Sequence, residues 1–137
     1  MAEASRPARG LVDTSVVIDL DQIDAAQLPI ELAISALTMA ELAAGPHAAG
    51  DPGERARRQD RLQRAEATFD PLPFDGDAAR AYGRIYAEIV ATGRKARGAR
   101  VVDLLIAATS VAADLPLYTR NVEDFRGIEH LLALVGV

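Results

Sequence analysis

Four acidic residues lie where a chain of alternating strands and helices would place a reactive site. Asp13 follows the apolar run 10–12, and Glu41 lies early in the helix after a second apolar segment. Asp103 is nearly the only charge in an apolar helix, and Asp124 follows a later strand-like segment. Carboxylates hold divalent cations through oxygen and move protons in hydrolysis. Their chemistry therefore depends on whether the fold brings them together.

Each acid also has an ordinary structural role. Asp13 can cap the helix that begins at Thr14, because Asp is a favoured N-cap residue. Thr38 and Glu41 form the T-x-x-E pattern of a capping box. An acid in the first turn of a helix, such as Asp103, is favoured by the helix dipole. The sequence leaves both kinds of role open for these residues.

Strand-like and helix-like segments alternate along the chain. Strands are expected at 10–13, 30–36, 116–119 and 131–137, and helices at 14–20, 38–44, 54–68, 75–92 and 101–113. This order is typical of an α/β fold, and it predicts a three-layer α/β/α domain with a mostly parallel central sheet. Residues 1–9 are expected to be a flexible tail, and residues 10–137 to form a single domain.

Acids that follow parallel strands would meet at one edge of the sheet. Two carboxylates about 4 Å apart repel by roughly 4 kcal/mol at an effective dielectric constant near 20. Such a cluster must share protons or bind a cation. The chain has no Cys and only 2 His, which disfavours thiolate and imidazole sites. A site made of carboxylate oxygens would suit Mg²⁺ or Mn²⁺.

The overall charge and hydropathy limit how this protein could associate with nucleic acid or a membrane. The net charge of −5 argues against non-specific coating of nucleic acid by the whole surface. No apolar run reaches the length of a membrane-spanning helix, and the N-terminal residues lack a signal-peptide core. We therefore expect a cytoplasmic protein without a membrane partner.

Four blocks of sequence occur in a characteristic order: LVDTSVVIDL, ALTMAELAAGP, ARVVDLLIAATS and LPLYTRNVEDFRGIE. Together they resemble the PIN-domain ribonucleases and, within them, the VapC-type toxins. The resemblance runs from about Gly10 to the C-terminus. It implies a PIN-like fold and a Mg²⁺- or Mn²⁺-dependent endoribonuclease toxin that hydrolyses RNA phosphodiester bonds. It also implies products with 5′-phosphate and 3′-hydroxyl ends, a cognate VapB-type antitoxin and a homodimer.

The resemblance also assigns roles to the acids. By position, Asp13 and Asp103 match the principal metal ligands of the family, and Glu41 matches its third acid. The fourth acid is open between two places, because this chain has Asn121 directly after the strand and Asp124 three residues later. We predict Asp124 as the fourth catalytic and metal-binding acid. Nearby polar residues are expected to support the site: Thr14, Thr119 and Asn121.

RNA phosphates approaching an acidic site need cations beside it. The basic stretch before Asp103 and one arginine after the third strand are therefore predicted to bind RNA: Arg94, Lys95, Arg97, Arg100 and Arg120. Ordinary solvated loop charges are the alternative for each of them. The helices at 54–68 and 78–92 are expected to provide contacts for an antitoxin or a second subunit.

One other function is compatible with these residues. The chain could be a catalytically weak PIN-like module that binds RNA or a protein without turnover. The acidic net charge and the uncharged Asn121 favour this alternative, whereas intact Asp13, Glu41 and Asp103 count against it.

Overall fold

The computed structural model describes residues 6–93 and 99–137. Their central sheet contains four parallel strands in the order β2-β1-β3-β4, which are β1 (Arg9–Val12), β2 (Glu31–Ala33), β3 (Leu117–Thr119) and β4 (Leu134–Gly136). Leu11 in β1 lies opposite Ala33 of β2 and Leu117 of β3. The predicted parallel sheet is confirmed.

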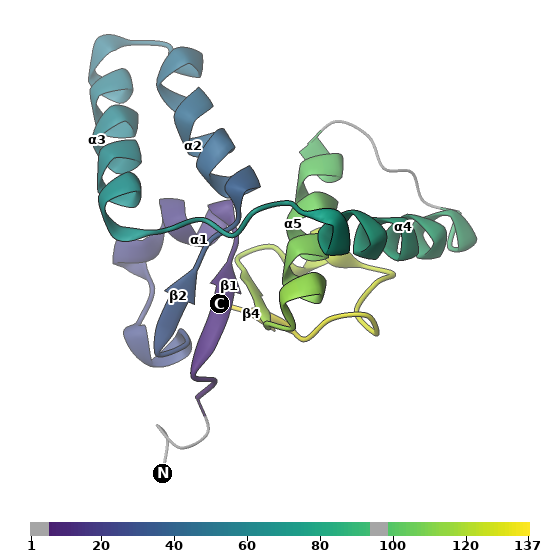
Figure 1. Ribbon diagram of the computed structural model, residues 1–137. Helices are drawn as coiled ribbons and strands as arrows, with labels where there is room; N and C mark the ends of the chain where they lie inside the picture. The colour runs from purple at the N-terminus through teal and green to yellow at the C-terminus, as the bar shows by residue number, and fades with distance from the viewer. Residues whose placement is uncertain (1–5, 94–98) are drawn as a thin grey trace.

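Helices cover both faces of this sheet. They are α1 (Thr14–Ile18), α2 (Ala36–Ala48), α3 (Pro52–Thr68), α4 (Gly76–Ala91) and α5 (Ala99–Ala113), with 3-10 turns η2 (Leu20–Gln22), η3 (Ala25–Gln27) and η4 (Val122–Phe125). In Figure 1, α2 and α3 form a hairpin on one side, and α4 and α5 lie together on the other. This arrangement is the expected three-layer α/β/α fold.

The alternation of side chains in β1 divides the core into two parts, because successive strand residues face opposite sides of a sheet. Leu11 packs with Ile85 of α4 and Leu104 of α5. The next residue, Val12, packs with Val16 of α1 and Leu42 of α2. β1 is therefore fixed from both faces, and the residue after it, Asp13, has little freedom of position.

Residues 6–9 differ from the expected tail. Arg9 belongs to β1, and the N–H of Glu31 donates to the carbonyl of Ala8 at 2.9 Å. The side chain of Arg6 donates from Nε to the carbonyl of Leu28 at 3.1 Å. These residues lengthen the strand pairing through their backbone, which a polar composition does not reveal. The prediction of a tail over 6–9 was wrong; residues 1–5 lie outside the described residues.

The start and end of α2 also differ from expectation. The helix begins at Ala36, and the hydroxyl of Ser35 accepts from the N–H of Thr38 at 3.1 Å. Ser35 is therefore the N-cap, and the capping-box alternative for Thr38 and Glu41 does not hold. The helix also continues past Gly45 and the buried Pro46 to Ala48. A guanidinium N–H of Arg58 donates to the carbonyl of Gly45 at 2.9 Å, which supports this last turn.

The helix after Asp75 agrees with its prediction. The carboxylate of Asp75 accepts from the N–H of Ala78 at 3.0 Å and so caps α4. The inward face of α4 is buried at Ala78, Ala81, Ile85 and Ile89. Across the described residues, no helix is both long enough and apolar enough to cross a membrane.

The capping geometry makes a direct prediction for stability. Ser35→Ala should lower the free energy of unfolding by about 1 kcal/mol, since the first turn of α2 loses its side-chain acceptor. Glu41→Gln should not lower it, since Glu41 does not cap. Urea denaturation at neutral pH without divalent cations measures both values. A larger loss in Glu41→Gln than in Ser35→Ala would restore the capping-box interpretation.

Candidate active site

Asp13 lies directly after β1 and opens α1. Its carboxylate oxygen Oδ1 accepts from the N–H of Val16 at 3.2 Å and from the hydroxyl of Ser15 at 2.6 Å. Its own N–H donates to the carbonyl of Tyr118 at 3.0 Å, and the residue is only 5% exposed. Both bonds to the side chain use one oxygen, so Asp13 caps the helix while Oδ2 stays available for another ligand.

Glu41 is held by hydroxyl groups from two helices. Thr14 of α1 donates from Oγ1 to Oε1 of Glu41 at 2.5 Å. The Oγ1 atoms of Thr14 and Thr38 lie 3.1 Å apart. A hydroxyl has a single proton, and that of Thr14 goes to Glu41, so the fully buried Thr38 is the donor to Thr14. The bond from Thr14 fixes Glu41 beside the end of β1.

Thr38 is a site residue that the sequence interpretation missed. Its three-residue spacing from Glu41 was the available signal, but that spacing also fitted a capping box. In the structure Thr38 and Glu41 are linked through Thr14, whose hydroxyl is hydrogen-bonded to both side chains. The two residues do not cap the helix.

The pKa of Asp103 is sensitive to the charges of the other three acids. Burial, together with the negative charges of Asp124, Asp13 and Glu41, raises the pKa of Asp103 from 3.8 to about 7. The Arg100 guanidinium acts in the opposite direction on this pKa. The fold therefore brings all four predicted acids into one electrostatic cluster, from β1, α2, α5 and η4.

The influence on the pKa of Asp103 also distinguishes Asp124 from Asn121 as the fourth acidic position. Among the carboxylates that raise the pKa of Asp103, Asp124 has the largest influence. Asn121 is exposed, and its N–H donates to the hydroxyl of the buried Thr119 at 3.0 Å, which shapes the turn after β3. Asp124, one turn later in η4, is thus the acid coupled to Asp103, and its role as a metal ligand stays a prediction.

The predicted RNA-binding cations have different surroundings. Arg94, Lys95 and Arg97 lie outside the described residues. Arg100, at the start of α5, is close enough to act on the pKa of Asp103. Arg120 pairs through Nε with Asp19 Oδ2 at 3.3 Å.

Ser15 links Asp13 to the loop after β3. Its Oγ donates to Asp13 and accepts from the N–H of Arg120 at 3.1 Å. The cap of α1 is Asp13 itself, as one of its two possible roles required. Ser15 instead fixes the distance between the ends of β1 and β3.

The four acids influence one another electrostatically without closing on one point. Within residues 6–93 and 99–137, no three acidic or histidine side chains have the arrangement of a ready-made metal site. This agrees with the raised pKa of Asp103, because Coulomb forces act over longer distances than the 2.0–2.1 Å of a Mg²⁺–oxygen bond. Asp13 is buried, whereas Asp124 is exposed at the rim.

Comparison with known proteins identifies the family. Residues 10–131 match the model of the PIN domain. The chain is 36% identical over 129 residues to Ribonuclease VapC5 of Mycobacterium tuberculosis, covering 92% of each protein. This chain belongs to the VapC-type PIN-domain family. Ribonuclease VapC of Rickettsia bellii is a second relative of the VapC-type chain, at 30% identity over 90% of this chain and 93% of that protein.

Solved structures agree with this VapC-type assignment. The crystal structure of VapBC-5 from Mycobacterium tuberculosis, a member of the VapBC family of toxin–antitoxin systems, matches with a TM-score of 0.84 and 34% identity. That match covers 96% of this chain and 100% of the other. VapBC2 from Rickettsia felis shares the fold with a TM-score of 0.76 at 22% identity, over 94% of this chain and 98% of that chain.

The raised pKa of Asp103 predicts a pH-dependent stability in this VapC-type chain without divalent cations. Below about pH 4 Asp103 is protonated in both states, so it has no effect. Between about pH 4 and pH 7 the carboxyl group ionises in the unfolded state but stays protonated in the folded state, so stability falls; above about pH 7 both states are ionised and the loss is complete. Asp103→Asn should therefore raise the free energy of unfolding at pH 8 by about 2 kcal/mol, a value discounted for partial exposure.

Urea denaturation in EDTA at pH 4 and pH 8 measures this difference between the two proteins. The gain should be much smaller at pH 4, where the folded carboxyl group is protonated and the unfolded one only partly ionised. An equal gain at both values would show that packing, and not charge, is responsible.

Proposed function

We propose that this chain is a metal-dependent endoribonuclease toxin that hydrolyses RNA phosphodiester bonds and is neutralised by a VapB-type antitoxin. The relatives named Ribonuclease VapC and the VapBC toxin–antitoxin structures support this proposal. The observation that carries it is the pKa of Asp103, raised to about 7 beside Asp124, Asp13 and Glu41. Such repulsion between acids is a cost in folding, which a bound cation would relieve.

The donor chemistry fits Mg²⁺ or Mn²⁺. Asp13, Glu41, Asp103 and Asp124 would hold the cation with carboxylate oxygens, which are hard ligands. When bound, such a cation activates water and offsets the charge on phosphoryl oxygens. The exposed position of Asp124 leaves the site open to a polymer substrate.

The surrounding residues prepare these acids for that task. Ser15 and the N–H of Val16 orient Asp13, and the Thr14 hydroxyl orients Glu41. Asp103 must lose its proton before it can serve as a ligand, so activity should rise as the pH passes upward through neutrality.

The proposed partners are an RNA strand, a VapB-type antitoxin and a second copy of this chain. Arg100 lies beside Asp103 and would help to dock a phosphate. The apolar, Arg-bearing surfaces of α3 and α4 would provide contacts for the antitoxin or the second copy.

Cleavage of total RNA by the purified protein tests the proposal. With Mg²⁺ or Mn²⁺ the protein should cut RNA to products with 5′-phosphate ends, found by sequencing, and EDTA should stop the reaction. Asp103→Asn should lower the rate by at least about 100-fold, since a ligand carboxylate is lost from the site.

Asp114→Asn is a matched control at the other end of α5. Asp114 is exposed and has a φ of 55°, a backbone conformation that Asn readily adopts. This variant should cleave at the normal rate. A folded Asp103→Asn protein that cleaves RNA as fast as the original chain would contradict the proposed mechanism.

A further inference from the structure

Two neighbouring cavities lie along the boundary between α1 and α3. The first, of about 310 Å³, contains Thr14 and Glu41 of the candidate site. The second, of about 250 Å³, extends along α3 to Phe69. Ile18 and Arg61 line both cavities, so these two side chains stand between the acidic centre and the second cavity.

Arg61 differs from the other arginines of this groove. Arg58 pairs through Nε with Glu54 at 3.0 Å, and Arg64 pairs with Asp60 at 3.1 Å. Within the described parts of the chain, half-buried Arg61 has neither a hydrogen bond nor an ion pair. A guanidinium has five N–H donors, and a partly desolvated one gains from an anionic ligand.

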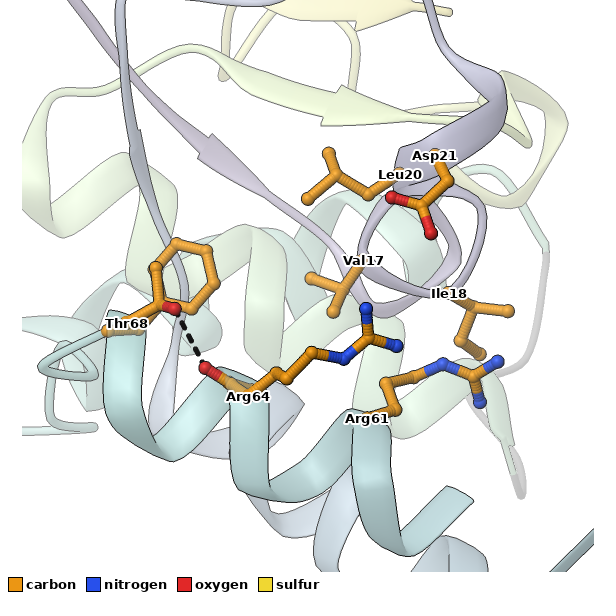
Figure 2. Close-up of a pocket in the computed structure, with 9 residues that line it drawn as sticks. Val17, Ile18, Leu20, Asp21, Arg61, Arg64 and Thr68 are labelled. Carbon is orange, nitrogen blue, oxygen red and sulfur yellow. Dashed lines mark hydrogen bonds between the residues drawn. The ribbon is translucent and has the colours of Figure 1, made fainter. Parts of the chain in front are cut away.

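The walls of the second cavity combine this charge with apolar surface. Figure 2 shows Arg61 and Arg64 extending from α3 toward Val17 and Ile18 on α1, with Asp21 above them. Phe69 adds an aromatic wall. A single-stranded nucleic acid complements these walls, because its negatively charged phosphates alternate with bases that have flat apolar faces.

We propose that the second cavity binds a nucleotide of the RNA strand next to the scissile phosphate, and that Arg61 binds the phosphate between them. This inference rests on the proposed ribonuclease function. An RNA cut beside Glu41 must continue beyond the acidic centre, and the shared wall of the two cavities places Arg61 on one such path. The Asp21 carboxylate repels phosphate and accepts from a base amino group, which directs the base toward that wall.

An acidic segment of a protein partner is the competing occupant, because a carboxylate also pairs with a guanidinium. Continuity with the cavity that contains Glu41 favours RNA. It connects the nucleotide pocket with the place where the strand would be cut.

Binding of a short, labelled single-stranded RNA of mixed sequence tests the assignment. Asp103→Asn serves as the parent, so that the RNA stays intact, and Arg61→Gln is added to it. The affinity should fall about tenfold, the value of one charged hydrogen bond. The slope of log affinity against log salt should decrease by roughly 0.7, the value for one phosphate of a single strand.

Two further variants separate position and charge from folding. Arg55→Gln removes the same charge from an exposed position on α3 outside both cavities, and should leave the salt slope unchanged. Arg61→Lys keeps the charge and should keep most of the slope while losing the planar fork. Circular dichroism confirms that each variant is folded.

A neutral methylphosphonate placed at each phosphate in turn locates the contact. At one phosphate the substitution should weaken binding to the parent but not to Arg61→Gln, as expected for a directly coupled pair. Unchanged RNA affinity and salt slope in Arg61→Gln would overturn the assignment. RNA binding that is unchanged, together with loss of a co-expressed antitoxin, would assign the cavity to a protein segment instead.

These experiments distinguish failure of the nucleotide pocket from failure of the ribonuclease proposal. If the original chain cuts no RNA but binds it through Arg61, the ribonuclease proposal fails and the nucleotide pocket stands. If the original chain cuts RNA and Arg61→Gln cuts and binds it equally well, the nucleotide pocket alone is wrong.

Discussion

Repulsion among Asp13, Glu41, Asp103 and Asp124 is the interaction on which the rest of this structure depends. The four carboxylates come from the end of β1 and from α2, α5 and η4. Burial and the charges of the other three acids together raise the pKa of Asp103 to about 7. The fold holds Asp13 in place by packing β1 from both faces, with Leu11 in one core and Val12 in the other. The stability lost at the acidic centre is offset by these two apolar layers.

Hydroxyl groups make the arrangement specific. Ser15 bonds both to Asp13 and to the loop after β3, and Thr14 bonds both to Glu41 and to Thr38. The two neighbouring residues of α1 thus orient two different acids. The short helix α1 can orient both acids because Thr14 and Ser15 lie in its first turn and its N-cap, Asp13, is itself one of the acids.

The sequence predicted the features that depend on pattern. Alternating apolar segments indicated the parallel sheet, and acids following those segments indicated one shared edge. Features that depend on tertiary hydrogen bonds were not predictable. Ser35 and Thr38 are both good N-cap residues, and only the position of Leu72, whose carbonyl accepts from Ala36, fixes the start of α2. The backbone pairing of residues 6–9 and the continuation of α2 through Pro46 likewise depend on neighbours distant in sequence. Nor did composition indicate the groove beside Arg61, because its two cavities combine residues of α1, α2 and α3.

Titration of the Asp103 carboxyl carbon by NMR, without divalent cations, tests the central claim of convergence most directly. The account predicts a pKa of about 7 for Asp103, and a lower pKa in Asp124→Asn, because Asp124 is the carboxylate with the largest influence. A pKa near the ordinary 3.8 in the folded protein, unchanged in Asp124→Asn, would contradict it and would mean that the acids do not form one cluster.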